Sequence, residues 1–131
     1  MLQLVYVSSV TRSEVIAPGP ILTASRRNNQ RDGITGLLYS DDARFLQVLE
    51  GPEDKVEQTF ARIQTDPRHR ALVILSRRTI DAREFGDWEM AHYAPGSDAD
   101  AFIERIARLA ANASSDVRAT FEGFAKVRRA A

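Results

Sequence analysis

The chain has 131 residues, of which 44% are hydrophobic and 27% are charged, and this fits one globular domain that buries its own core. Its 18 basic residues balance 18 acidic ones, so no overall charge attracts nucleic acid or anionic lipid, and we expect neither as a partner. The absence of cysteine excludes disulfides, thiolate metal sites and a thiol nucleophile, so redox chemistry needs a bound cofactor or an aromatic residue.

The first predicted element is a strand over residues 2–8. This segment lacks the basic stretch and long apolar run of a signal peptide. No later segment reaches the roughly 18 apolar residues of a membrane span, so we expect a cytoplasmic protein with no membrane partner. The residues of the strand alternate in a way that suits burial on both faces. Leu2, Leu4 and Tyr6 share one face, and Gln3, Val5 and Val7 share the other.

A short helix and a β-hairpin are predicted next. A polar loop interrupted by Pro18-Gly19-Pro20 leads to a helix over about residues 21–29, and residues 30–33 have the composition of a turn. Two apolar, β-prone stretches at residues 34–40 and 44–50 are separated by three polar or small residues. This pattern predicts two strands joined as a hairpin.

The rest of the chain alternates helices and strands. Pro52 and two acidic residues open a segment with apolar residues at helical spacing, which predicts a second helix that ends at Asp66-Pro67. Residues 71–78 and 88–92 are predicted to be strands. Beyond Pro95, two runs of apolar residues at three- and four-residue intervals predict two amphipathic helices, divided near residues 112–115.

This order of elements is typical of a ferredoxin-like α+β sandwich. We predict a five-stranded mixed sheet with two helices on one face, plus two C-terminal helices. The core domain is expected over residues 1–93. Residues 94–131 are expected to form a helical extension that packs on the same domain.

Polar side chains embedded in apolar elements are the candidate functional residues, because a buried amide or phenol is costly unless it is hydrogen-bonded. Tyr6 and Gln47 are expected to point to the same side of the sheet, and Asn28 and Asn29 close the first helix. On residue type alone, Tyr6 is more typical of a core tyrosine whose hydroxyl bonds a neighbour, and Asn29 is more typical of a helix C-cap. An inward amide on a central strand is harder to explain structurally, so together these residues predict a polar ligand edge between helix and sheet.

Two longer stretches resemble a known family. The segment SRRNNQRDGITGLL at residues 25–38, followed by FLQVLEG at residues 45–51, is similar to the core signature of BLUF domains, which are flavin-binding receptors for blue light. The resemblance extends to Tyr6 in VYVS, to DPRH at residues 66–69 and to FGDWEM at residues 85–90. It implies that residues 1–93 bind a flavin noncovalently and that the protein is a photoreceptor and not an enzyme.

The resemblance also assigns a photoactive group. Tyr6 would hydrogen-bond Gln47, and the amide of Gln47 would reach toward the flavin N5 and O4 atoms. Tyr6 would supply an electron and a proton to the illuminated flavin, after which Gln47 would change its hydrogen bonding by rotation or by tautomerisation. In similar proteins Trp88 or Met90 stands next to the glutamine as the fifth strand shifts, although both residues also suit an ordinary core.

The flavin-binding residues implied by the resemblance come from three segments. Asn29 would pair with the polar edge of the ring, since a carboxamide offers both a donor and an acceptor, and Asn28 would wall the ring beside it. Gln47 would contact the ring from the sheet. Arg62, Ile63, Arg68 and His69 match positions that flank the ring and the ribityl phosphate. We expect FAD as the flavin, with FMN or riboflavin as alternatives.

Two other function classes are compatible with the fold. Acylphosphatases are small ferredoxin-like enzymes, but the glycine-rich anion loop that their chemistry needs near the first strand does not appear. A flavin-free protein-interaction module would keep the fold and lose the light chemistry, and the retained Tyr6, Asn29 and Gln47 favour the photoreceptor. We expect signalling through contact with an unidentified downstream protein or within a homo-oligomer, a dimer or larger.

Overall fold

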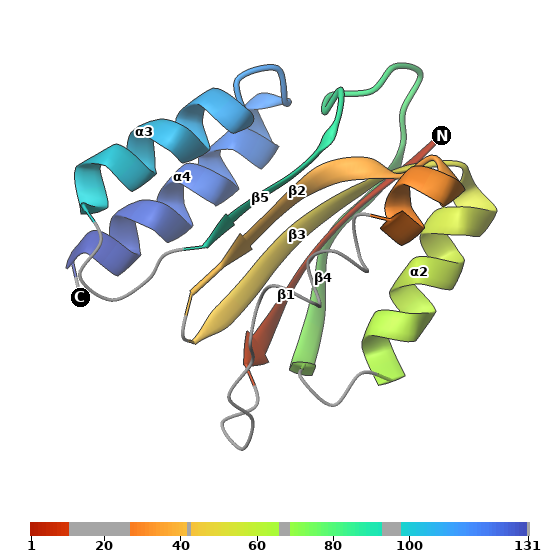
Figure 1. Ribbon diagram of the computed structural model, residues 1–131, viewed down its shortest axis with the longest axis horizontal. Coiled ribbons are helices and arrows are strands. Elements are labelled where there is room, and N and C mark those ends of the chain that lie inside the picture. Colours follow the sequence, from red (N-terminus) through yellow and green to blue (C-terminus); the bar gives the residue numbers. More distant parts are fainter. Residues whose placement is uncertain (11–26, 42, 66–68, 93–97, 131) are drawn as a thin grey trace.

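The computed structural model describes residues 1–10, 27–41, 43–65, 69–92 and 98–130. Within these ranges five strands form one mixed sheet in the order β4-β1-β3-β2-β5. The strands are β1 (Leu2–Val10), β2 (Thr35–Ser40), β3 (Arg44–Gly51), β4 (His69–Thr79) and β5 (Trp88–His92). β1 is antiparallel to both β3 and β4, β2 is antiparallel to β3, and β5 runs parallel to β2 (Figure 1).

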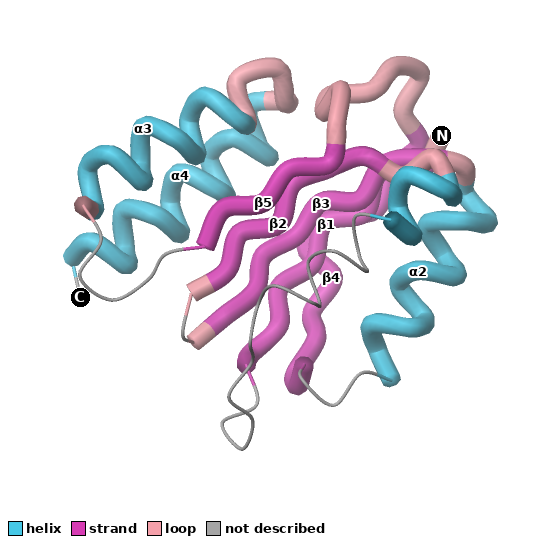
Figure 2. The backbone as a smooth tube through the Cα atoms, in the orientation of Figure 1, coloured by secondary structure: helices cyan, strands magenta, loops and turns pink. Residues whose placement is uncertain are grey.

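Helices cover both faces of this sheet (Figure 2). α2 (Glu53–Thr65) lies on one side, and α3 (Ala99–Leu109) and α4 (Ser115–Ala130) lie together on the other. Residues 27–32 are also helical and stand on the α2 side. The predicted ferredoxin-like α+β fold with a five-stranded mixed sheet and C-terminal helices is confirmed. In the described part of the chain, no helix is both long and apolar enough to cross a bilayer.

Two hydrophobic cores follow from the alternation of β1. The α2 side buries Leu2, Leu4 and Tyr6 of β1 against α2, and the opposite side buries Val5 against α3 and α4. The α2-side core consists of Leu2, Leu4, Tyr6, Ile34, Leu49, Val56 and Phe60. Because both faces are covered, the five residues from Leu2 to Tyr6 are all buried, as the sequence predicted for this strand.

The end of the first helix differs from the prediction. The sequence placed the end near residue 29, but the helix continues to residue 32. Gly33, with φ of 70°, donates to the carbonyl of Gln30, and the Ile34 N–H donates to the carbonyl of Asn29 at 2.8 Å. This is the bonding of a Schellman motif, in which Gly33 takes the left-handed position that terminates the helix. Asn29 is therefore a residue of the last helical turn and not the C-cap.

Other element boundaries differ by one or two residues. β1 extends to Val10, and β4 begins at His69 and not at residue 71, because the longer β1 pairs with β4 as far as Val10 opposite His69. α2 begins directly after Pro52, whose carbonyl accepts hydrogen bonds from the N–H groups of Lys55 and Val56. The division between the two C-terminal helices falls at residues 110–114, close to the predicted position.

Candidate functional site

A buried tyrosine–glutamine pair lies at the centre of the α2 face. Tyr6 on β1 is directly opposite Gln47 on β3 in the antiparallel register. The Tyr6 hydroxyl donates a hydrogen bond to Gln47 Oε1 at 2.5 Å. Tyr6 is completely buried and Gln47 is 6% exposed. The prediction that the two side chains point to the same side of the sheet is correct.

This hydrogen bond fixes what the glutamine can offer to a ligand. With its carbonyl oxygen accepting from Tyr6, the other polar atom of the amide, Nε2, is a donor. A rotation of the amide would exchange the two atoms and present an acceptor in place of a donor. The pair is therefore a polar group with two arrangements, held inside an apolar core where each hydrogen bond counts more than in water.

α2 forms one wall around this pair. The ring of Phe60 packs on the ring of Tyr6, with centroids 5.3 Å apart and an interplanar angle of 59°. Ile63, one helical turn further, is partly buried against the same core. Both side chains come from the apolar stripe of α2 that faces the sheet. Phe60 did not stand out in the sequence, because its spacing is equally that of an ordinary amphipathic helix.

The last turn of the first helix, on the same side of the sheet, contains two asparagines. Asn29 is 4% exposed, whereas Asn28 is half-buried. Because the backbone carbonyl of Asn29 is closed by Ile34, the buried carboxamide of its side chain is a separate polar group on the α2 side. Asn29 and Gln47 are two of the few buried polar residues in the described chain, and both were predicted as site residues.

Arg62 links α2 to the end of the first helix at the surface. Its guanidinium donates to Thr59 Oγ1 at 3.1 Å and contacts Asp32 Oδ2 at 3.5 Å, while its side chain remains 52% exposed. Arg31 also bonds Asp32, and the hydrogen bond from Arg31 lowers the pKa of the Asp32 carboxyl. Arg62 thus lies at the rim of the site, where it has a free side to meet an anion from solvent.

The fifth strand brings its predicted residues to the neighbouring part of the sheet. Met90 pairs with Leu38, which in turn pairs with Gln47, so Met90 occupies the row of Gln47. Trp88 pairs with Gly36, two residues away along β2. The register therefore places Met90 in line with the glutamine and Trp88 one step along the strand. The Met90 side chain lies outside the described part of the structure.

Trp88 carries an unsatisfied donor on this side of the sheet. Ala91 belongs to the core under α3 and α4, so Trp88, three residues earlier in the same strand, faces the α2 side. The side chain is 5% exposed, and its buried Nε1 has no hydrogen-bond partner among the described residues. A buried indole N–H normally has an acceptor, so this donor points to a group that completes the site.

The side chains of two predicted site residues lie outside the described part of the structure. Arg68 lies in a segment that the structure does not describe, and only the backbone of His69 is described, as the first residue of β4. Their predicted contacts with a phosphate tail stay predictions. Gln47, Asn29 and Trp88 are buried and between them offer amide donors, amide acceptors and an indole donor, which are the groups that bind a flat heteroaromatic ligand with both donors and acceptors.

Sequence reasoning missed a second polar cluster on the opposite face. Gln3 and Glu50 are completely buried there and bind each other, together with Arg78 and Glu84. The available signal was a glutamine at an inward position of a strand whose neighbours are apolar. Gln3 has the same pattern as Gln47, on the other side of the sheet.

Comparison with known proteins agrees with this site. The model of the BLUF family, described as sensors of blue-light using FAD, matches residues 1–91. The photoactivated adenylate cyclase subunit beta of Euglena longa is 32% identical over 91 residues, which cover 67% of this chain and 11% of that subunit. The chain thus spans about a tenth of the length of these cyclase relatives.

Solved structures match over most of the chain. The Klebsiella pneumoniae protein BlrP1, with FMN and cyclic diGMP, is 34% identical with a TM-score of 0.73, over 83% of this chain and 30% of that one. The dark-state structure of BlrB, a BLUF protein, is 29% identical with a TM-score of 0.69, and the match covers 96% of both chains. With the family model covering residues 1–91, this chain belongs to the BLUF family of flavin-binding blue-light sensors.

Proposed function

We propose that this protein senses blue light by switching the hydrogen bonds of Gln47 beside a bound flavin, and that it signals by contact with another protein molecule. The observation that carries the switch is the buried hydrogen bond from Tyr6 to Gln47. The residues present fit a flavin, because Gln47, Asn29 and the indole N–H of Trp88, which has no partner among the described residues, are buried polar groups that offer both donors and acceptors to its ring. These three side chains would hold the ring.

Each residue of the pair has a distinct task in this proposal. A flavin held by these residues would supply the absorption of blue light and, in its excited state, an oxidant. Tyr6 is the side chain that would release an electron and its hydroxyl proton, and its hydroxyl donates a hydrogen bond to Gln47 Oε1. The amide of Gln47 would then change its hydrogen bonding, by rotation or by tautomerisation. The lit state would differ from the dark state in this arrangement of hydrogen bonds. Phe60 keeps water away from the pair.

The first experiment is a visible spectrum of the protein purified without added cofactor. A flavin band that shifts reversibly to the red under blue light is the expected result. Tyr6→Phe and Gln47→Leu should each abolish the shift and leave the flavin bound. Tyr39→Phe is the matched control, because Tyr39 is an equally buried tyrosine that bonds Asp41 and packs under α3 on the opposite face. A colourless protein that refuses added flavin would instead support the flavin-free interaction module.

The phosphate tail of the flavin is a finer part of the proposal. We infer FAD, in keeping with the family, and the exposed guanidinium of Arg62 supports a contact with a phosphate, which suits its planar fork of donors. FMN is the alternative. Heating the protein and separating the released flavin by chromatography distinguishes the two, and Arg62→Gln is expected to lower the affinity for either phosphorylated flavin while leaving that for riboflavin unchanged.

The proposed output is contact between protein molecules in the cytoplasm, including self-association. Its support is β4, an edge strand on which Val73, Ile74 and Leu75 expose about half of their surface, at 52%, 49% and 47%. An edge strand with three consecutive exposed apolar residues is a ready site for pairing with a second strand. Sedimentation of the wild type and of Val73→Thr/Leu75→Thr tests this, and we expect a dimer or larger assembly that the double substitution dissociates. A wild type that is monomeric at high concentration would refute self-association.

A further inference from the structure

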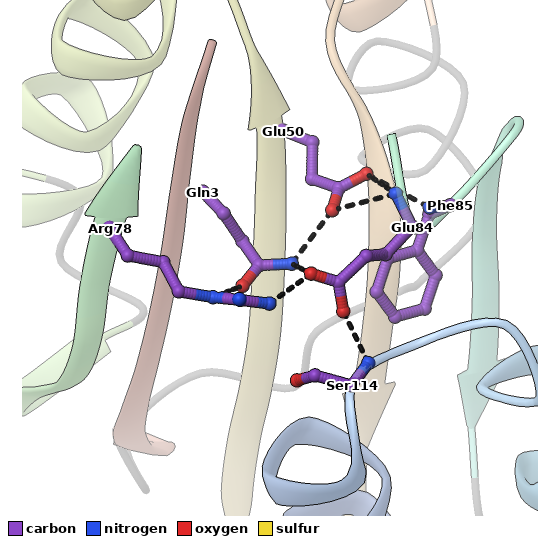
Figure 3. Close-up of polar contacts among 6 residues, drawn as sticks. All are labelled: Gln3, Glu50, Arg78, Glu84, Phe85 and Ser114. Carbon is purple, nitrogen blue, oxygen red and sulfur yellow. Dashed lines mark hydrogen bonds and ion pairs between the residues drawn. The ribbon is translucent and has the colours of Figure 1, made fainter. Parts of the chain in front are cut away.

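We propose that Glu84 is a positioning residue of the light response, which holds the N-terminal end of α4 against the sheet in the dark and loosens that hold when β5 rearranges. This inference rests on the proposed function, since it supplies a route from the flavin side of the sheet to the helices on the other side. The residues that carry it are drawn in Figure 3.

Glu84 lies in the connection that leads from β4 into β5, four residues before Trp88. Its carboxylate accepts a hydrogen bond from Gln3 Nε2 at 3.0 Å, forms an ion pair with Arg78 and accepts from the backbone N–H of Ser114. Its side chain is only 14% exposed. One carboxylate thus binds β1, β4 and the residue that precedes α4.

The contact with Ser114 is a contact with the start of a helix. The Ser114 carbonyl accepts from the N–H of Arg118 at 3.0 Å, so Ser114 occupies the N-cap position of α4. A carboxylate at this place binds a backbone donor and also faces the positive end of the helix dipole. Since α3 and α4 pack on each other, fixing this end of α4 fixes the pair.

A second buried carboxylate holds the backbone of Glu84 in place. Glu50, which is completely buried, accepts hydrogen bonds from the N–H groups of Glu84 and Phe85, at 3.0 and 2.9 Å from Oε1, and from Gln3 Nε2 at 2.7 Å. Glu50 stands three residues after Gln47 on β3. The same strand therefore carries the proposed switch on one face and the support of Glu84 on the other.

The network is built so that it changes as a unit. A buried carboxylate that loses its donors is costly, so Glu50 and Glu84 resist partial disruption, whereas a concerted rearrangement can exchange several bonds together. The element that can drive such a change is β5, since its first residue, Trp88, would bond the flavin on one face of the sheet and follows Glu84 by only four residues. Movement of β5 pulls on the segment that carries Glu84.

The test compares light and dark in the full chain with Glu84→Gln. This substitution keeps the size of the side chain but removes its charge and replaces one of the two acceptor oxygens by an N–H donor, so the side chain can no longer accept from Ser114 and from Arg78 at the same time. If the contact is stronger in the dark state, its loss raises the dark state relative to the lit state, because the coupling is reciprocal. We propose that the contact is already re-formed in the transition state of the return to the dark state, so its loss slows that return, and we expect a slowing of about fivefold or more.

Hydrogen exchange of α4 gives the second readout. In the wild type, illumination should increase exchange of the amides at residues 114–118. In Glu84→Gln these amides should exchange faster in the dark, with no further increase in light, while the red shift of the flavin is kept. A merely structural role of Glu84 would loosen α4 without changing the rate of dark recovery. Unchanged recovery, or a light-dependent increase that survives the substitution, overturns the proposal.

Three further variants make the result specific. Glu104→Gln removes an exposed carboxylate of α3 and should behave as the wild type. Arg78→Gln removes the ion pair but keeps the Ser114 contact, so it should retain most of the light-dependent exchange. Glu84→Asp, which keeps the charge but shortens the reach to Ser114, replaces Glu84→Gln if the latter does not fold, and the same slowing is expected. A wild type without any red shift would refute the proposed function itself, and the two failures are therefore distinguishable.

Discussion

Gly36 on β2 is the position where a single added carbon would disturb the sheet most. Its φ is +154°, and a Cβ built there would lie 1.9 Å from the carbonyl oxygen of Val48 on the neighbouring strand. Backbone cannot move aside as a flexible side chain can, so we expect Gly36→Ala to lower the free energy of unfolding by about 2–4 kcal/mol.

Urea denaturation followed by circular dichroism measures this change. Gly86→Ala is the matched control, because Gly86 is exposed and a Cβ there meets no atom within 4 Å. The control should change the free energy of unfolding by no more than about 0.5 kcal/mol. Equal stability of the two variants would contradict the steric explanation.

The lowered pKa of Asp32 predicts how the stability of the fold changes in acid. The hydrogen bond from Arg31 lowers the pKa of the Asp32 carboxyl in the folded state, so between the folded and unfolded pKa values the unfolded chain binds more protons. The contribution of Asp32 to stability is therefore complete above its unfolded pKa, about 3.9, and is lost as pH falls through the lower folded value. In Asp32→Asn this contribution is absent.

Melting temperatures between about pH 5 and pH 3 check the sign of the effect. The wild type should lose more stability across this interval than Asp32→Asn. Asp81→Asn, at an exposed position in the β4–β5 connection, controls for the removal of a charge. Parallel curves for the wild type and Asp32→Asn would show that the Arg31–Asp32 contact does not contribute.

At the scale of elements, α4 contains a glycine that the fold does not require. Gly123 lies within the helix, and a Cβ there meets nothing within 4 Å. Alanine restricts the unfolded chain and favours the helix, so Gly123→Ala should raise the free energy of unfolding by about 0.5–1 kcal/mol. Thermal unfolding measures the gain, and a lower melting temperature would indicate that this helix face needs the small residue for a partner.

The first helix shows where local patterns mislead at this scale. Residues 30–32 have turn composition but are helical, because Gly33 can take the left-handed position and close the Schellman motif with Ile34 buried behind it. The sequence contained the glycine, but nothing local decided whether it began a turn or ended a helix. Burial of Ile34 in the α2-side core decided it.

At the scale of the whole molecule, the Tyr6–Gln47 pair and the C-terminal helices pack on opposite faces of one sheet, in separate hydrophobic cores. Phe121 of α4 is completely buried in the core under α3 and α4, away from Tyr6 and Gln47. Phe121→Ala should lower the free energy of unfolding by about 3–5 kcal/mol through the cavity that it leaves, yet keep the red shift of the flavin.

Phe60→Ala is the matched comparison on the other face. Phe60 is 8% exposed and packs on Tyr6, so its loss should reduce flavin retention and alter the light response, besides lowering stability. Spectra and denaturation curves of both variants separate the two effects. A Phe121→Ala variant that folds but has lost its red shift would show that the two faces are not separate in this sense.

Much of the fold and of the site could be predicted from the sequence alone. Period-two alternation predicted that Tyr6 shares a face of β1 with Leu2 and Leu4 and that Gln47 shares a face of β3 with Leu49, and the register that pairs Tyr6 with Gln47 puts these two faces on the same side. The two-residue alternation is a property of any strand, so it survives every tertiary arrangement. The signature residues around Asn29 and Gln47 likewise indicate the family from the sequence alone.

What only the tertiary structure decided are the relations between distant segments. Met90, and not Trp88, lies in line with Gln47 across the sheet. This depends on how β5 pairs with β2, and the two strands are more than 50 residues apart in the chain. The contact of Glu84 with Ser114 joins segments 30 residues apart and needs the two helices to fold back on the sheet. No local pattern encodes such contacts, because hydrogen bonds between side chains and distant backbone are set by register and packing, which form only when the whole chain is assembled.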